Sequence, residues 1–568
     1  MPHRFTRRKF VRTVAVGAAA SIGARHSLGA SATTQAKSIP PDEIAAALRA
    51  IGRDFTAAED KMMVEGLTGR RDLYKSMRKR SIDERTEPAI QFNPRLPSVK
   101  YPSGESSFKL SEGSLVDYNG DPSSLAFASA VDLSRLIHAK KITSLELTKM
   151  YLDRLERIGK RLNAVVNLTS DLAMAQAKRA DEELAQGKSR GPLHGLPYGA
   201  KDLLATKDIP TTWGVKPLEN QVFDYDATVI EKLEAAGAVL VAKLSLGELA
   251  MGDVWFGGMT RTPWNEKEGS SGSSAGPCAA TAAGCVAFAI GSETLGSIIS
   301  PCLVNGTTGL RPTYGRVSRY GAMSLSRTMD KLGPITRCVE DSAMVLNAIH
   351  GADDRDPTAI ANVPFTWDPT SDLKKVRVGY DVAAFEQLKK SKATTKHAAI
   401  QTALDQIKDL VGGELKPIHL PPTEPYAGIA SLFIAAEAAC NFNDLIESGK
   451  VRDLVQQDGG SWPNTFRKGT LIPAADYLRA MQLRTQLMQA MHEAMKDVDL
   501  YVTIPYSGPT ISFTNVTGHP SLVTRAGMVG GRPIFLEFLA QPYREDAALR
   551  LALAYEKAND WNKTWPSV

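Results

Sequence analysis

Two segments rich in glycine and serine, and one lysine upstream of them, could carry nucleophilic chemistry in this chain. The first segment, GSSAG at 272–276, fits the G-x-S-x-G pattern of a nucleophile elbow. An elbow requires a buried strand before the serine, but residues 261–268 are polar and contain proline. None of the nine histidines is marked by its neighbours as a base. The sequence therefore disfavours a Ser-His-Asp triad, and a flexible Gly/Ser linker is the plain alternative.

The second segment, GSETLGS at 291–297, follows an apolar run at 286–290 that predicts a buried strand. A tight turn after a strand can direct several main-chain N–H groups into one small volume, which makes an oxyanion site. Ser297, at the end of this turn, is then a candidate nucleophile. The alternative is that Ser297 caps a helix.

Lys201 is the candidate base, because it follows an apolar approach in GLPYGAKD at 195–202. A lysine can accept a proton near neutral pH only if burial keeps it uncharged. Two serines and such a lysine could form a proton relay without histidine. The alternative is a surface lysine that pairs with Asp202.

Four segments occur in an order and spacing typical of one family. They are GPLHGLPYGAKD (191–202), GSSAGPCAATAAG (272–284), GSETLGSIISPCLVNGTTGLRPTYGRVSR (291–319) and TGHPSLV (517–523). On these motifs the chain resembles the amidase signature family over about residues 124–560. The GSETLGS form is more similar to the bacterial peptide-amidase and plant-type branch than to the tRNA amidotransferase subunits.

The resemblance implies a Ser–cis-Ser–Lys triad. It assigns the nucleophile to Ser297, the bridging serine to Ser273 with a cis bond from Gly272, and the base to Lys201. It also implies that Ser274 hydrogen-bonds within the relay. The implied oxyanion donors are the main-chain N–H groups of Thr294, Leu295, Gly296 and Ser297.

Three residues depart from the family pattern near this turn. Glu293 stands where many members have Asp, Leu295 where many have Gly, and Ile299 where many have Arg. We expect the triad to be unaffected, whereas the support of the turn and contacts to the substrate could differ.

Apolar runs and helical periodicity alternate from about residue 124, which predicts an α/β fold with a large mixed, mostly parallel sheet sandwiched between helices. The expected strands include 238–242, 286–290, 376–380 and 500–504. Thr143 and Glu146 form a possible capping box. The predicted domains are an N-terminal helical and wrapping extension at 33–120, helical over 41–81, and an amidase domain at 121–568 with a helical insert at about 430–497.

Residues 1–32 resemble a twin-arginine export signal, with Arg7-Arg8 before a short uncharged run and an Ala30-Ser31-Ala32 cleavage pattern. Six basic residues in this segment account for the whole net charge of +6. The remainder is not basic enough to favour nucleic acid, and we expect a periplasmic or secreted protein without a membrane anchor.

The five cysteines are odd in number and form no C-x-x-C, so buried free thiols are expected rather than a disulfide framework. The sequence contains no metal-ligand cluster and no nucleotide-binding loop, so no cofactor is implied. We expect an amidohydrolase that acts on a small-molecule or peptide amide. The alternatives are an amidotransferase A-type subunit and a non-catalytic binding protein on the same scaffold. The substrate's acyl and amine groups, ester cleavage and the oligomeric state are left open.

Overall fold

The computed structural model describes residues 38–568, except for residues 54, 80, 81, 84, 87–89, 98, 360–362 and 391–393. The predicted export signal at 1–32 lies outside the described residues. The chain divides into two compact units, residues 1–80 and 81–568. The predicted domain limits at 32/33 and 120/121 stay a prediction.

The described residues of the first unit form the helices α2 (Pro41–Ala50) and α3 (Ala57–Arg78). The expected helical stretch at 41–81 is thus interrupted at 51–56. Thr56 begins α3 with a capping box, because its hydroxyl accepts from the Glu59 N–H and the Glu59 carboxylate accepts from the Thr56 N–H.

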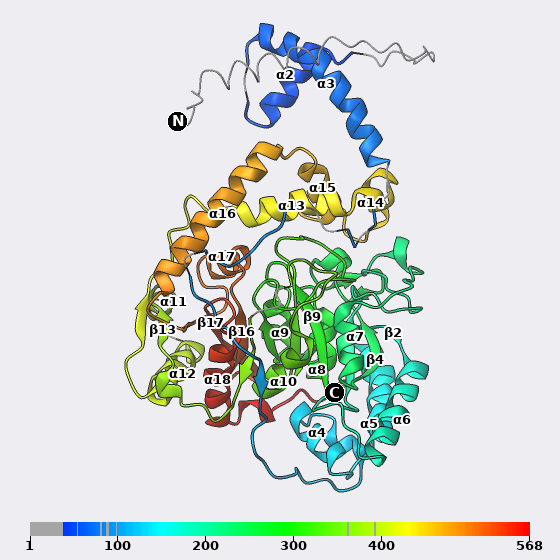
Figure 1. The fold of residues 1–568 in the computed structure, drawn as a ribbon, viewed down its shortest axis with the longest axis vertical. Helices are drawn as coiled ribbons and strands as arrows, with labels where there is room; N and C mark the ends of the chain where they lie inside the picture. Colours follow the sequence, from blue (N-terminus) through cyan, green and yellow to red (C-terminus); the bar gives the residue numbers. More distant parts are fainter. Residues whose placement is uncertain are drawn as a thin grey trace, which may run out of the picture. The chain divides into compact units, whose positions relative to one another are not determined.

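An eleven-stranded sheet forms the centre of the described part of the second unit (Figure 1). In order across the sheet, its strands are β14 (Lys416–Ile418), β13 (Val378–Asp381), β15 (Leu500–Thr503), β17 (Arg532–Ala540), β16 (Ser521–Val529), β10 (Thr308–Arg311), β11 (Lys331–Thr336), β9 (Phe288–Glu293), β3 (Pro197–Lys201), β4 (Val239–Leu244) and β2 (Val165–Leu168). The four runs expected as strands correspond to β4, β9, β13 and β15. The predicted α/β class with a mixed sheet is therefore confirmed.

The expectation of a mostly parallel sheet is wrong. Among the described strands, β14–β13–β15 and β9–β3–β4 pair in parallel, whereas the other six neighbouring pairs are antiparallel. One reason is the β16–β17 hairpin, whose connection is Gly530-Gly531. Both glycines have positive φ, of 60° and 74°, as a two-residue hairpin turn requires. Such a short connection can join only antiparallel strands.

Helices cover both faces of the sheet (Figure 1). The helices of the second unit are α4 (Ala130–His138), α5 (Ser144–Arg154), α6 (Ser170–Ala185), α7 (Thr228–Ala235), α8 (Ala275–Ala282), α9 (Ile299–Asn305), α10 (Val339–Ile349), α11 (Val382–Lys390), α12 (Thr395–Val411), α13 (Ile429–Asn441), α14 (Asn443–Glu447), α15 (Trp462–Gly469), α16 (Ala474–Met495), α17 (Thr510–Thr517) and α18 (Glu545–Lys557). The capping box of Thr143 and Glu146 at the start of α5 is confirmed.

Alternating residues of one strand enter different hydrophobic clusters, as the two-residue period of a strand requires. In β9, Phe288 and Ile290 pack in a cluster that includes α10, α12 and α18. Ala289, between them, packs in a second cluster with α8 and α9. The strand that leads to the oxyanion turn is therefore buried on both faces and held rigidly.

The helices α13 to α16 follow β14 along the chain and precede β15. The yellow and orange helices α13, α15 and α16 lie together, next to α17 (Figure 1). A third hydrophobic cluster joins α13, α16 and α17 and includes Phe433, Leu487 and Phe513. The Leu- and Met-rich stripe of α16 thus packs largely in the core.

The segment that precedes α4 runs mostly without regular structure. Within it, β1 (Ser107–Phe108) pairs in parallel with β12 (Thr366–Trp367), so it is tied to the second unit by main-chain hydrogen bonds. Two further short pairs, β5 (Val254–Trp255) with β6 (Gly258–Met259) and β7 (Arg261–Thr262) with β8 (Asn265–Gly269), lie before α8.

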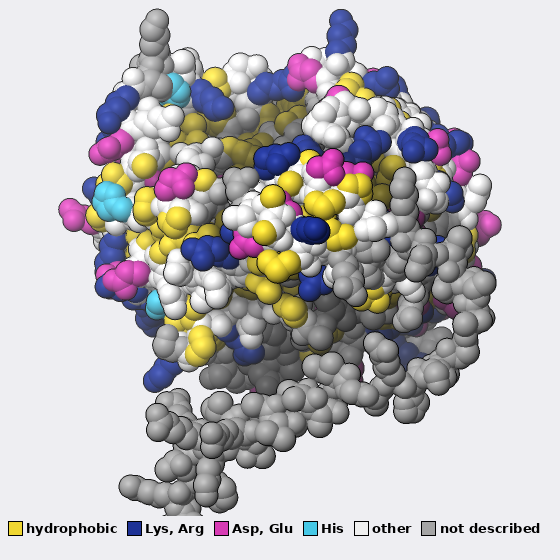
Figure 2. Space-filling model, turned by 90° about the horizontal axis from the view of Figure 1, so that it is seen from above, with side chains coloured by type: hydrophobic (Ala, Val, Ile, Leu, Met, Phe, Trp, Pro, Cys, Tyr) yellow, Lys and Arg dark blue, Asp and Glu magenta, His cyan; other side chains and the backbone are white. Residues whose placement is uncertain are grey.

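Acidic and basic side chains are interspersed on the face shown in Figure 2. Across the described residues, no helix is both long enough and apolar enough to cross a membrane. All five cysteines are free, and four of them are buried, as expected; Cys440 is exposed.

Candidate active site

Lys201 is the last residue of β3 and is completely buried. Its Nζ donates to the hydroxyls of Ser273 at 2.7 Å, Ser274 at 3.1 Å and Ser292 at 2.9 Å. No ion pair joins Lys201 to a carboxylate among the described residues. Burial lowers the pKa of Lys201 to about 7, because the charged ammonium loses its hydration while nearby acids compensate only in part. The amine is therefore available as a base near neutral pH.

The two serines of the first segment lie where β8 leads into α8. Ser271 and Gly272 both have positive φ, of 63° and 52°, so the chain turns sharply just before Ser273. A Cβ on Gly272 would lie 2.3 Å from Cδ of Pro301, so only glycine fits the turn. The segment is neither a linker nor an elbow, because Ser273 and Ser274 are fully buried and bonded to Lys201.

The bond between Gly272 and Ser273 is not cis, so this expectation is wrong for the structure. The cis peptide bond found among the described residues is Glu424–Pro425. The left-handed conformation of Gly272 supplies the change of direction instead, and Ser273 Oγ still reaches Lys201.

Ser274 links the base to the neighbouring strand. Its Oγ accepts from the Ser292 N–H at 3.1 Å and donates to the Ser292 carbonyl at 3.0 Å, while it also accepts from Lys201. The expected hydrogen bonding of Ser274 within the cluster is confirmed. Ser292 is a third hydroxyl partner of Lys201 that the sequence did not single out.

Ser297 lies beside this cluster but is not bonded to it through its side chain. Its carbonyl accepts from the Ser274 N–H at 3.1 Å, which fixes its backbone next to the relay serines. Its side chain is partly exposed, and its Oγ makes no hydrogen bond with any described residue. The structure thus unites Lys201, Ser273 and Ser274, and leaves the hydroxyl of Ser297 free to face a substrate.

The oxyanion turn at 294–297 joins β9 to α9. The N–H groups of Leu295, Gly296 and Ser297 make no hydrogen bond within the described part of the chain, so they are free to bind an oxyanion. The Thr294 hydroxyl donates to Asp330 at 2.5 Å, which anchors the start of the turn.

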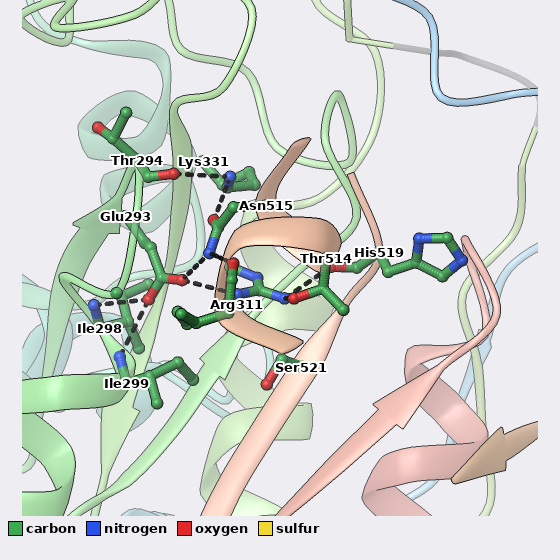
Figure 3. Close-up of polar contacts among 12 residues, drawn as sticks. Glu293, Thr294, Ile298, Ile299, Arg311, Lys331, Thr514, Asn515, His519 and Ser521 are labelled. Atoms are coloured by element: carbon green, nitrogen blue, oxygen red, sulfur yellow. Dashed lines mark hydrogen bonds and ion pairs between the residues drawn. The ribbon is translucent and has the colours of Figure 1, made fainter. Parts of the chain in front are cut away.

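A buried ionic network that includes Glu293, Arg311 and Lys331 holds the two ends of this turn in place (Figure 3). Glu293 accepts from the N–H groups of Ile298 and Ile299 at 2.9 and 3.0 Å, and from Arg311 at 2.7 Å. Burial alone would raise the pKa of Glu293, but the Arg311 and Lys331 charges outweigh it and hold that pKa at about 2. The carboxylate therefore stays ionised and fixes the first N–H groups of α9.

The two other departures from the family pattern have packing explanations. Ile299 is fully buried in the cluster that contains α8 and α9, so an apolar side chain fits this position. Leu295 packs against the cluster formed by α13, α16 and α17.

The predicted alternative of an ion pair between Lys201 and Asp202 is wrong. Asp202 instead lies 3.3 Å from Nζ of Lys243, and both side chains are fully buried. Lys243 also donates to Thr211 Oγ1 and to the Leu204 carbonyl.

Tyr506 is a second residue near the turn that sequence reasoning missed. Its hydroxyl donates to the Gly296 carbonyl at 3.5 Å, and a Cβ on Gly296 would lie 2.4 Å from it. Tyr506 has a φ of 62°, which is unusual for a bulky residue. The only sequence signal was the turn-forming PYSGP at 505–509.

A narrow crevice of about 10 Å³ adjoins the relay. Ser292, Thr294 and Asp330 line it on one side, and apolar residues such as Leu203 and Met323 line the other. The described residues contain no cluster of His, Cys, Asp or Glu that could hold a metal ion.

The family model described as Amidase matches residues 146–508. The chain belongs to the amidase signature family. The A subunit of the glutamyl-tRNA(Gln) amidotransferase from Carboxydothermus hydrogenoformans is 32% identical over 491 residues, which cover 78% of this chain and all of the relative. The corresponding subunit from Roseiflexus sp. is 34% identical over 75% of this chain and 96% of the relative.

Solved structures of amidase signature enzymes have the same fold. The native peptide amidase from Stenotrophomonas maltophilia superposes with a TM-score of 0.69 at 29% identity, covering 78% of this chain and 99% of that chain. The predicted family and fold are thereby confirmed, and the chain is an amidase-family enzyme.

Proposed function

We propose that the protein hydrolyses a carboxylic amide through an acyl-enzyme on Ser297. The observation that carries the proposal is the environment of Lys201, a buried amine bonded only to hydroxyl and carbonyl oxygens. An amine without a carboxylate partner has little electrostatic reason to stay charged when buried, so it is suited to accept a proton.

In the first half-reaction, Ser297 Oγ attacks the carbonyl carbon of the amide. Ser273 takes the proton of Ser297 and passes its own to Lys201. Because Ser297 Oγ has no partner, rotation about its Cα–Cβ bond can bring it to Ser273 when substrate binds. The free N–H groups of the turn hold the developing oxyanion, and one such donor is typically worth about 3 kcal/mol.

Ser273 then protonates the leaving nitrogen as the C–N bond breaks, with Lys201 returning the proton. The amine or ammonia leaves, and the acyl group stays on Ser297 as an ester. Water attacks this ester by the same relay and releases the carboxylic acid.

A second candidate is the A-type subunit of an amidotransferase. The curated relatives favour it, because the A-type subunits of two glutamyl-tRNA(Gln) amidotransferases are 32% and 34% identical to this chain over almost their whole length. The chemistry at Ser297 would be the same for a glutamine side chain. The difference is that ammonia would pass to a partner protein rather than to solvent.

Export supports the hydrolase over the amidotransferase, since aminoacylated tRNA is found in the cytoplasm. We infer export from the twin-arginine-like segment at 1–32. Expression of the full chain in a bacterium, fractionation and N-terminal sequencing test it. Cleavage after Ala32 in the periplasmic fraction is expected, and an uncleaved cytoplasmic chain would contradict export.

Ammonia release from a panel of primary amides tests the function. The panel contains amidated peptides, aryl amides, fatty amides and glutamine, the last with and without glutamyl-tRNA and the partner proteins. Turnover of a free amide that Ser297→Ala abolishes would support the hydrolase. Ammonia from glutamine only in the presence of tRNA and the partner proteins would establish the amidotransferase. No turnover, and no labelling of Ser297 by a fluorophosphonate, would contradict both and favour a binding protein.

A further inference from the structure

A larger cavity lies in the second unit, and none of its lining residues belongs to the relay or the oxyanion turn. Its volume is about 390 Å³, and it is partly open to solvent. Its walls come from the segment around 94–102, the C-terminal part of α16 with the residues after it, and the chain around 517–519 and 541–544. The function proposed above leaves this cavity without a role.

Positive charge predominates among the residues that line this cavity. Its permanently charged side chains are those of Lys100, Arg377, Lys496, Arg544 and Asp499. The Asp499 carboxylate accepts hydrogen bonds from Arg377 at 2.9 Å and from Arg544 at 3.3 Å. Two acids outside the lining also form ion pairs with these residues. Glu493 pairs with Lys496, and Asp546 pairs with Arg544. Asp497 also acts on Arg377 and Lys496 through its charge. Lys100 is exposed and makes no ion pair with a described residue, so it offers the cavity an unpaired positive charge that suits an anion.

His519 is a polar side chain that lines this cavity, and it is only 4% exposed. Its Nδ1 lies 2.7 Å from Thr517 Oγ1, and that hydroxyl donates its only proton to the Phe513 carbonyl at 2.8 Å. Nδ1 must therefore carry the ring proton, which leaves Nε2 as a bare acceptor. No described residue donates to Nε2, and the ring points away from the Glu293–Arg311 network (Figure 3).

A ligand that satisfies both features is an anion that carries its own O–H group. Burial and the Arg311 charge lower the pKa of His519 to about 3, so the ring stays neutral and cannot itself donate from Nε2. A fully deprotonated oxyanion such as sulfate would place lone pairs against the lone pair of Nε2. Inorganic phosphate keeps at least one P–O–H at neutral pH, so it can donate to Nε2 while its charge faces the lysines and arginines.

We propose that this cavity is a binding site for inorganic phosphate. The P–O–H donates to His519 Nε2, and the charged oxygens face Lys100, Lys496 and the two guanidinium groups at Asp499. The site is separate from the relay, so this proposal does not depend on the proposed amide hydrolysis.

Isothermal titration calorimetry of the full chain with phosphate and with sulfate, at pH 7.5 and equal ionic strength, tests the site. We expect one phosphate site with an affinity at least about tenfold higher than that for sulfate, since one charge-assisted hydrogen bond separates the two ions. The double variant Lys100→Ala with Lys496→Ala should weaken phosphate binding at least fivefold, because each exposed charge contributes about tenfold or less to the affinity. The matched control, Lys557→Ala with Lys563→Ala, removes two exposed lysines elsewhere on the same unit and should change nothing.

His519→Leu should abolish the preference for phosphate over sulfate. If this variant does not fold, the comparison of the two ions and the lysine variants still decides the matter. Equal binding of phosphate and sulfate, an equal loss in the control variant, or no binding of phosphate would each overturn the proposal.

Discussion

Two buried lysines on adjacent strands have opposite surroundings. Lys201 at the end of β3 is bonded to hydroxyls and a carbonyl, whereas Lys243 on β4 lies 3.3 Å from the carboxylate of Asp202. Both are completely buried, and burial lowers the pKa of both. Only Lys243 has a carboxylate at ion-pair distance that opposes this shift, whereas Asp330 and Glu293 act on Lys201 without pairing with it. The difference separates a lysine that can exchange a proton from one that holds two strands together.

Strand geometry explains why the acid next to Lys201 in sequence pairs with the other lysine. Successive side chains of a strand point to opposite faces. In the parallel β3–β4 pair, Ala200 lies opposite Lys243 and Lys201 lies opposite Leu244. Asp202 continues the alternation on the face of Ala200, so its carboxylate meets Lys243. The amine of Lys201 is directed to the serines on the opposite face.

The largest expected effect is that of Lys201→Met. Removing the base should lower kcat for the best amide substrate by about 10³-fold, because general base catalysis typically contributes 10²–10⁴-fold. Thermal unfolding should show that the fold is retained, since methionine fills the same volume without a buried amine. Unchanged kcat in a folded variant would refute the role of Lys201.

Lys243→Met should affect stability rather than chemistry. It leaves the buried Asp202 without its counter-charge, which typically costs about 3–5 kcal/mol of unfolding free energy. Urea denaturation measures the loss, and kcat per folded molecule should change little. Adding Asp202→Leu to this variant should restore much of the stability, because an apolar pair replaces the ionic one. A kcat loss as large as that of Lys201→Met would remove the distinction between the two lysines.

Glu293→Gln should have a smaller effect on catalysis, about tenfold in kcat, by loosening the N–H groups at the start of α9 that shape the oxyanion turn. It should also change acid stability. Because the pKa of Glu293 is lowered from 4.5 to about 2, its stabilisation is fully present above pH 4.5 and is lost as the pH falls toward 2. The variant should lack this contribution in acid denaturation. Identical acid denaturation and identical kcat would contradict the support role of Glu293.

Ser292→Ala should have the smallest effect, a three- to tenfold loss in kcat, as expected for one neutral hydrogen bond of about 0.5–1.5 kcal/mol. Loss of an oxygen that stabilises the ammonium should also lower the apparent pKa of the pH–rate profile. Ser245→Ala is the matched control, because Ser245 is also buried but bonds Thr260 and the Asn163 carbonyl. A shift of the profile in the control, or none in Ser292→Ala, would count against the assignment.

The sequence was sufficient for the residues whose chemistry is written in their type and spacing. Lys201 and Ser297 could be proposed from the residues around them, whereas the roles of Ser273 and Ser274 were implied by the resemblance to the amidase signature family. The buried strands β4, β9 and β15 could be found because each is a largely apolar run, and β13 because Val376, Val378 and Tyr380 alternate along it.

Other features depend on contacts between distant segments and could not be read from local patterns. The pairing of Asp202 with Lys243 requires the register of β3 against β4. Ser292 becomes a partner of Lys201 only because β9 lies beside β3. The β16–β17 hairpin did have a local signal in Gly530-Gly531, and weighing that signal would have corrected the expectation of a mostly parallel sheet.

The rate of fluorophosphonate labelling at Ser297 as a function of pH tests the central claim most directly, because it needs no knowledge of the substrate. Intact-mass spectrometry would follow labelling of the wild type, Lys201→Met and Lys243→Met from pH 5 to 9. Since the lowered pKa of Lys201 is about 7, the wild-type rate should rise as the pH passes through 7 and then level off. Lys243→Met should follow the same curve, and Lys201→Met should be labelled far more slowly at every pH. Labelling of Lys201→Met at the wild-type rate, or a wild-type rate that does not change around pH 7, would contradict the assignment of Lys201 as the base.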